Sequence, residues 1–178
     1  MNRLFSIVGK MPDKLWGPLA GGGLILVIGF SGLAANLPWL FTSLGPSAYL
    51  HTDRVYDKAS RPYNLIVGHL IAMAAGFFAI FVVNAWNDPS VVGTTYLTTG
   101  RILASVLGLV ITIPVQILLR ASHPPAPATA LLITLGDFQT ARGALALFAG
   151  IMLTGIIGEG LRQLRVKSQE YLKRRGKL

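Results

Sequence analysis

Residues 62–87, PYNLIVGHLIAMAAGFFAIFVVNAWN, contain no Lys, Arg, Asp or Glu. About 20 such residues are enough for a helix to cross the hydrocarbon core of a bilayer, so this stretch predicts a membrane helix over residues 64–85. The whole chain has a similar character, because 52% of its 178 residues are hydrophobic and only 13% are charged. Soluble domains carry about 25% charged residues. The composition therefore excludes a soluble enzyme, a disordered chain and, since Cys is absent, a disulfide scaffold.

The apolar pattern predicts an all-α integral membrane protein that forms a single membrane domain over residues 1–178. Residues 15–52 carry no formal charge apart from the titrating His51, and they are too long for one crossing. Pro38 and the Gly45-Pro46 pair interrupt them, because proline cannot continue a helix without losing a hydrogen bond. We expect four long transmembrane helices over residues 17–40, 64–85, 96–119 and 143–161, and two short membrane-embedded half-helices over residues 46–52 and 124–135.

The charged residues gather outside these segments. The net charge of +9 and the pI of about 10.4 would by themselves favour a nucleic acid partner. However, seven Lys and Arg face Glu170 alone within residues 162–178. A basic tail after an apolar body is typical of a cytoplasmic flank that contacts anionic lipid, so we expect no nucleic acid partner.

The same residues predict the orientation. Arg3, Lys10 and Lys14 precede the first long helix, so both termini are expected in the cytoplasm of a bacterial-type inner membrane, after an even number of crossings. With four crossings, the basic loop 53–61 would lie outside. With six crossings, in which the short segments also traverse the membrane, this loop and Arg120 lie inside, and we favour this topology. The first apolar stretch is too long for a secretory signal, so the mature chain is expected to start near Met1.

The two halves of the chain resemble each other. Ser43 and Ser122 are 79 residues apart, as are Pro46 and Pro125, and each pair follows a long apolar segment. We interpret residues 15–88 and 94–161 as two copies of an inverted repeat, an arrangement found in many secondary transporters. Chance similarity between two apolar, proline-broken stretches is the alternative.

The short segments point to an anion site. Proline fits the first turn of a helix, and a preceding Ser can cap it, so Ser43 and Ser122 are expected to begin short helices. A helix that begins inside a membrane has free N–H groups and a positive dipole end, which lipid cannot satisfy. Such an end binds anions readily. Simple broken segments at the membrane interface are the alternative.

Three blocks carry a family resemblance. They are SHPPAPATALL (residues 122–132), SLGPSA (residues 43–48) and PYNLIVGH (residues 62–69). Together they resemble the HPP family of integral membrane proteins, whose plastid and cyanobacterial members are associated with nitrite transport. The resemblance implies a compact helical bundle that transports or conducts an anion. Two departures are Pro127, where a glycine is common, and the polar run 49–54, which would shorten the first half-helix.

These arguments select the residues expected to bind a small inorganic anion, with nitrite as one possible substrate. His123 and His69 would donate hydrogen bonds to the anion or carry a coupled proton. Each histidine has an alternative structural role, in capping the backbone or in packing. The full predicted substrate site contains Ser43, Gly45, Pro46, Ser47, Asn64, His69, Ser122, His123, Pro124, Pro125 and Thr129.

No catalytic residue, metal or cofactor is predicted. His51 lies near Asp53 and Asp57, but their spacing fits a polar loop better than a metal site. Two other functions remain open. One is a membrane-embedded enzyme that uses these residues and His69, and the other is a non-catalytic scaffold that binds other membrane helices.

The remaining charged and small residues suggest structural roles. Arg101 and Arg120 are expected to reach the interface as snorkelling side chains, although Arg120 could also attract anions. Glu159 and Arg162 have the i, i+3 spacing of a surface ion pair. Small residues at four-residue spacing permit close helix contact, within one chain or between chains. Since four to six helices make a small bundle, we expect a homo-oligomer, a dimer or trimer. The two stripes are Ala146, Gly150, Thr154 and Gly158, and Ala104, Gly108 and Thr112.

Overall fold

The computed structural model describes residues 2–176, and this part of the chain is helical and contains no strand. Four helices are long and apolar enough to cross a membrane, which confirms the predicted fold class. They are α2 (Asp13–Ala34), α4 (Pro62–Val83), α6 (Thr99–Leu118) and α8 (Ala141–Arg174). The shorter elements are α1 (Asn2–Lys10), α3 (Leu44–Thr52), η1 (Lys58–Ser60), α5 (Val91–Thr94) and α7 (Ala126–Thr134).

Three of the four long helices end at a non-glycine residue in the left-handed conformation. These residues are Asn36, Asn84 and Arg120, with φ of 52°, 57° and 53°. After each of them, the next N–H donates to a carbonyl five residues back, as Leu37 does to Gly32 at 2.9 Å. This geometry closes the last helical turn. It stops α2 at Ala34, so the expected extension of the first helix to residue 40 is wrong.

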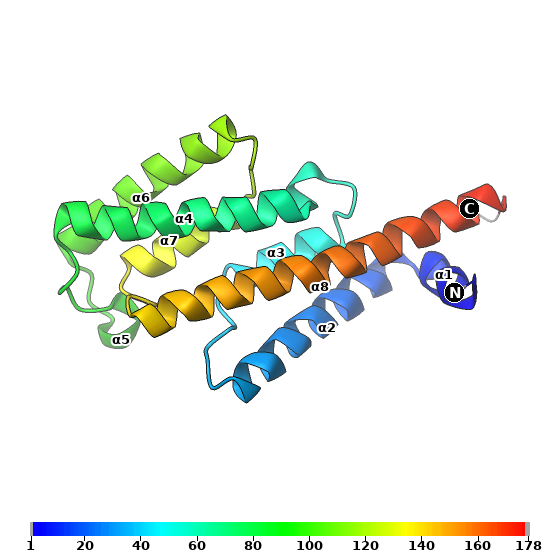
Figure 1. Cartoon of the computed structure of the whole chain (residues 1–178), viewed down its shortest axis with the longest axis horizontal. Helices are drawn as coiled ribbons and strands as arrows, with labels where there is room; N and C mark the ends of the chain where they lie inside the picture. Colours follow the sequence, from blue (N-terminus) through cyan, green and yellow to red (C-terminus); the bar gives the residue numbers. More distant parts are fainter. Residues whose placement is uncertain (1, 177–178) are drawn as a thin grey trace.

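Hydrogen bonds show which helix ends lie together. Tyr63 at the start of α4 donates to the carbonyl of Leu119 after α6, and Arg162 of α8 donates to the carbonyl of Val55. At the other end of the molecule, Arg142 at the start of α8 donates to the carbonyl of Asn36 after α2. Taken with α3 and α7, the long helices therefore form six segments that run alternately, so that α2 and α4 run in one direction, α6 and α8 run in the other, and both termini lie at one end (Figure 1).

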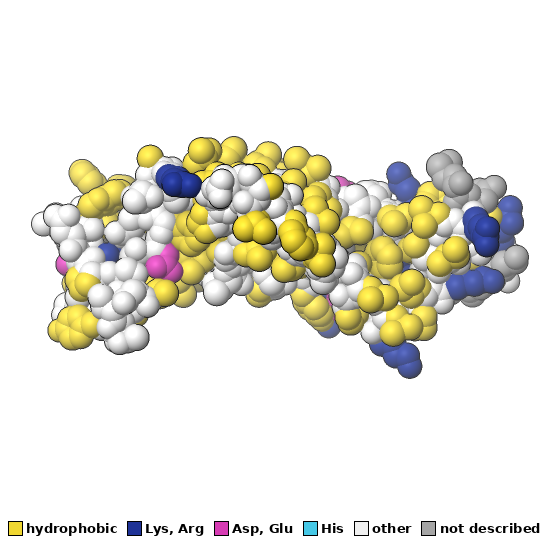
Figure 2. Space-filling view, turned by 90° about the horizontal axis from the view of Figure 1, so that it is seen from below, with side chains coloured by type: hydrophobic (Ala, Val, Ile, Leu, Met, Phe, Trp, Pro, Cys, Tyr) yellow, Lys and Arg dark blue, Asp and Glu magenta, His cyan; other side chains and the backbone are white. Residues whose placement is uncertain are grey.

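This arrangement separates the charges along the molecule. The N-terminal helix, the 53–61 loop, Arg120 and the late part of α8 share one end, which we call the basic end. Arg101 and Arg142 lie at the opposite end. Figure 2 shows most of the visible Lys and Arg side chains gathered at one end, and an apolar surface over the middle. The basic loops thus share an end with the termini, as the six-crossing topology requires.

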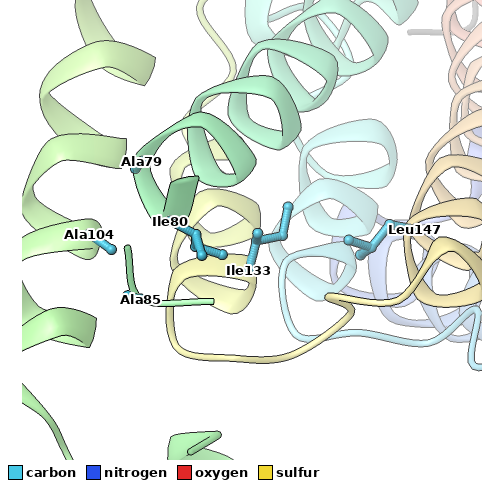
Figure 3. Packing of buried hydrophobic residues seen from close by; sticks show 6 residues of the cluster. All are labelled: Ala79, Ile80, Ala85, Ala104, Ile133 and Leu147. Atoms are coloured by element: carbon cyan, nitrogen blue, oxygen red, sulfur yellow. The ribbon is translucent and has the colours of Figure 1, made fainter. Parts of the chain in front are cut away.

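The core is built where small residues let helices approach. One buried cluster joins α4, α6, α7 and α8 (Figure 3), and its members are Ala79, Ile80, Ala85, Ala104, Ile133 and Leu147. A Cβ at Gly76 of α4 would lie 3.1 Å from the Cβ of Ile133. Both predicted stripes of small residues are buried within the chain. Gly108 faces Thr134, and Gly150 faces Phe41. These stripes serve contacts within one chain.

The ends of the chain differ from the sequence prediction. α8 continues through the basic tail to Arg174, and α1, which was not predicted, packs against it. Arg165 of α8 is 2% exposed and donates to the carbonyls of Val8 and Met11 and to Asp13. The first part of the tail is therefore a structural element, and its final residues 177–178 lie outside the described residues.

Candidate functional site

Five polar side chains meet in the interior, where α3, α4 and the segment entering α7 come together. Ser43 lies directly before α3, Ser47 in α3, His69 in α4, His123 in the loop before α7, and Thr129 in α7. All five are 0% exposed. We call them the histidine–hydroxyl cluster. Each belongs to the predicted substrate site, although they come from three separate parts of the sequence.

Ser47 is the centre of the cluster. Its Oγ lies 3.2 Å from Nε2 of His69 and 3.0 Å from Nε2 of His123, and it donates to the carbonyl of Ser43 at 3.0 Å. The two imidazole rings meet edge to face, with centroids 5.0 Å apart. One hydroxyl therefore connects both buried histidines.

The cluster continues from His69 to the start of α3. Nδ1 of His69 lies 2.8 Å from Oγ1 of Thr129, which lies 2.8 Å from Oγ of Ser43. The Ser43 hydroxyl is thus used across the bundle and makes no capping bond to its own helix, so the predicted capping role of Ser43 is wrong. Instead, Ser43 and Thr129 join the two short helices directly.

His123 is held in place from three directions. Its Nδ1 lies 2.9 Å from the carbonyl of Ala59, and because a carbonyl only accepts, this nitrogen carries a hydrogen. Its backbone N–H donates to Oε1 of Gln116 at 3.1 Å, and Nε2 of Gln116 donates to the carbonyl of Gly68 at 3.3 Å. Gln116 was not among the predicted site residues. Its signal in the sequence is that it is the one side-chain amide within the long helix α6.

The α4 backbone and the 119–125 segment are in close contact beside the cluster. A Cβ at Gly68 would lie 2.9 Å from the Cβ of His123 and 3.1 Å from the carbonyl of Ala121, so a larger residue does not fit. Asn64, one turn earlier, donates to the carbonyl of Ser122 at 3.0 Å. Asn64 therefore positions the loop that carries His123.

The other predicted site residues lie outside the cluster. Gly45, Pro46, Ser122 and Pro124 are exposed, and Pro125 is buried directly before α7. Ser122 does not cap α7, because the helix begins at Ala126 and its N-cap residue is Pro125.

The expected free N–H donors at the start of α7 are absent as well. Ala126 N–H donates to the carbonyl of His123 at 2.9 Å, and Ala128 N–H donates to that of Pro125. Side chains, and not the α7 backbone, supply the available donors.

A groove of about 520 Å³ lies between α2 and α3. Its lining includes Gly17 and Gly21 of α2 and Gly45, Ala48 and Thr52 of α3. These α3 residues lie on the side of the helix away from the cluster. The short helix α3 is therefore the wall between the open groove and the closed cluster.

Some charged residues form ion pairs, and others bond to backbone carbonyls in the interior. Glu159 and Arg162 form the predicted ion pair, with Nε 2.6 Å from Oε2. Arg101 is 0% exposed, so the prediction that it snorkels is wrong, and it instead donates to the carbonyls of Asp88, Pro89 and Thr134. Within residues 2–176 no three His, Asp or Glu side chains are grouped as metal ligands.

Comparison with known proteins identifies the family. The family model described as "HPP, transmembrane region" matches residues 8–161, a range that includes all five cluster residues. No curated protein and no solved structure matches the chain. Because the match covers most of the chain and includes the long helices that could cross a membrane, the protein belongs to the HPP transmembrane family.

Proposed function

We propose that this protein moves a small inorganic anion across a membrane, and that nitrite is the first substrate to test. Family membership and the apolar helices support a membrane transport role. The observation that carries the proposal is the histidine–hydroxyl cluster, in which Ser43, Ser47, His69, His123 and Thr129 are fully buried within a membrane bundle. Ionisable groups inside a membrane domain are costly, and they usually mark a transport pathway.

The chemistry of the cluster suits a small monovalent anion. Hydroxyls and imidazole N–H groups donate hydrogen bonds without a fixed positive charge, so an anion would be held and then released. The donors belong to side chains whose present partners are each other. An anion entering the cluster would replace these mutual bonds with bonds to itself. Binding therefore exchanges hydrogen bonds and does not require an unpaired polar group.

The packing of the helices supports the proposed inverted repeat. In the first half α2 contacts α3 and α8, and in the second half α6 contacts α7 and α4. If the two halves are exchanged, α2 takes the place of α6, α3 that of α7, and α4 that of α8. Helices that correspond in this way also make corresponding contacts. In transporters with such repeats, substrates bind where the two halves meet, and access alternates as one half moves against the other.

The groove beside α3 suggests how the cluster is reached. α3 has nine residues, about 14 Å at 1.5 Å per residue, and it alone separates the groove from Ser47. A small displacement of α3 would join the groove to the cluster. We propose that this side faces the cytoplasm, together with both termini, because the basic end lies there and cytoplasmic loops are enriched in Lys and Arg.

Reconstituted protein in liposomes tests the proposal. The purified chain should move nitrite faster than protein-free vesicles, and Ser47→Ala should reduce the rate about tenfold, because both histidines lose their shared partner. Thr112→Val is the matched control. Thr112 is also a buried hydroxyl that donates to the carbonyl four residues earlier, at 2.7 Å, but it lies outside the cluster. Flux equal to that of empty vesicles for a panel of small anions would refute the transport function. Equal loss in both variants would refute the role of the cluster.

A further inference from the structure

His51 is a buried histidine without a hydrogen-bond partner. It is 0% exposed, and neither Nδ1 nor Nε2 contacts a donor or acceptor. Leaving a buried polar group unpaired costs about 1–3 kcal/mol, so a residue of this kind calls for an explanation. Neither the packing of His51 nor the proposed anion site explains why both ring nitrogens are buried without a partner.

Its position connects it with the cluster. Ser43, Ser47 and His51 recur every four residues, so they lie on one face of α3. Four residues, about 6 Å at 1.5 Å per residue, separate Ser47 from His51 along the helix axis. A single water molecule or a rotation of the His51 ring spans such a gap. His51 therefore extends the row of polar side chains on this face of α3 from the cluster toward the basic end.

At its far side the His51 ring lies against α8. A Cβ at Gly158 would lie 2.9 Å from Cγ of His51 and 3.0 Å from its Nε2, so the glycine makes room for the ring. The next residue of α8, Glu159, is partly exposed and pairs with Arg162, which also donates to the carbonyl of Val55 at 3.0 Å. His51 therefore stands between the closed cluster and a carboxylate that meets solvent.

The cluster itself has room for one more hydrogen. Six hydrogen-bond contacts join its members to each other and to the carbonyls of Ser43 and Ala59. Three hydroxyls and two neutral imidazoles supply only five hydrogens for them. Because Nδ1 of His123 donates to Ala59 and the Ser47 hydroxyl donates to the Ser43 carbonyl, one added proton on Nε2 of His123 would supply the sixth. The neutral cluster is thus one hydrogen short of a complete network.

We propose that the cluster binds one proton and that His51 relays it between the cluster and Glu159, so that anion movement is coupled to proton movement. The proton passes from the Glu159 carboxyl to one nitrogen of His51, and the proton on the other His51 nitrogen passes to the cluster, which leaves His51 neutral. This inference rests on the proposed transport function. The groups that face this path from the elements around α3 are His69 of α4, His123 before α7, and Glu159 and Arg162 of α8. Asp13 and Lys14 of α2 line the groove on the other side of α3.

Proteoliposomes that contain a pH-sensitive dye test the relay. Nitrite entry into wild-type vesicles should alkalinise or acidify the lumen in fixed proportion to the anion moved, after subtraction of the nitrous acid leak measured in empty vesicles. His51→Gln should lower the protons moved per anion about tenfold, while nitrite exchange at equal pH stays within about twofold of wild type. Glu159→Gln, which can still bond to Arg162, should have the same effect. Thr52→Val is the neighbouring control, because Thr52 is buried and bonds only to the carbonyl of Ala48.

The outcomes separate this inference from the proposed function. Nitrite flux without proton movement in wild type would overturn the relay and leave the transport function intact, as would an unchanged proton-to-anion ratio in both His51→Gln and Glu159→Gln. If no anion moves at all, the transport function fails, and nitrogen-15 NMR of the histidines in detergent still tests proton binding. Gain of one proton by His123 on acidification would support the proton site, and a His123 imidazole that remains neutral until the protein unfolds would refute it.

Discussion

We predict that Arg101 contributes more to the free energy of unfolding than any other single side chain at the end opposite the termini. Its side chain is fully buried and donates through Nε to Pro89 at 3.2 Å, through Nη1 to Thr134 at 3.2 Å, and through Nη2 to Asp88. These bonds join the start of α6 to the 84–98 loop and to the end of α7. Hydrogen bonds to charged groups contribute about 1.5–3 kcal/mol each. With three bonds at the lower limit, Arg101→Gln should cost about 4.5 kcal/mol.

Thermal unfolding of the purified protein, followed by tryptophan fluorescence, measures this cost. For a chain of this size 1 kcal/mol shifts Tm by about 2–4 °C, so Arg101→Gln should lower Tm by about 9–18 °C. Arg142→Gln is the matched control, because Arg142 is exposed and donates to a single carbonyl, that of Asn36. Its loss should cost less than about 1 kcal/mol. If the two variants unfold within about 2 °C of each other, the carbonyl bonds of Arg101 do not stabilise this end.

Four further outcomes are expected. Gly68→Ala should cost about 1–3 kcal/mol through overpacking against His123, whereas Gly45→Ala, whose Cβ meets nothing within 4 Å, should leave Tm unchanged. Arg165→Gln should release α1 from α8, and limited trypsin digestion should then cleave α1 first. Deletion of residues 173–178 should weaken binding to vesicles of anionic lipid but not of neutral lipid. Native mass spectrometry from nanodiscs should detect a dimer or trimer, and a monomer would contradict the expected oligomer.

The long helices could be predicted from the sequence because their signal is local. In a bilayer, a long apolar run without charge, such as residues 62–87, is stable as a transmembrane helix. Their ends were less predictable, since Asn36 and Arg120 adopt a conformation that is uncommon outside glycine. α1 was missed for a different reason. It is too short to span the bilayer, and although its sequence is strongly amphipathic, that local pattern does not show that its partner is α8.

The candidate site was predictable in its members but not in its geometry. Ser47, His69 and His123 were identified because polar residues are rare in apolar segments. Which hydrogen bonds these side chains form depends on which helices pack together in the fold. The Ser43 hydroxyl, for example, bonds to Thr129 and does not cap α3. Gln116 was overlooked because an uncharged amide near a helix end has many ordinary explanations. Its contact with the His123 backbone exists only in the folded bundle.

The short helix α3 also constrains how the protein is made. Its nine residues are too few to span the bilayer core, and one face carries Ser43, Ser47 and His51, so it is poorly suited to remain in lipid alone. It packs chiefly against α2 and α8, and α8 follows the other helices of residues 2–176 in the sequence. We therefore expect the first half of the chain to remain incompletely packed in the membrane until α8 has been synthesised. The site would then be assembled in one step, when α8 inserts.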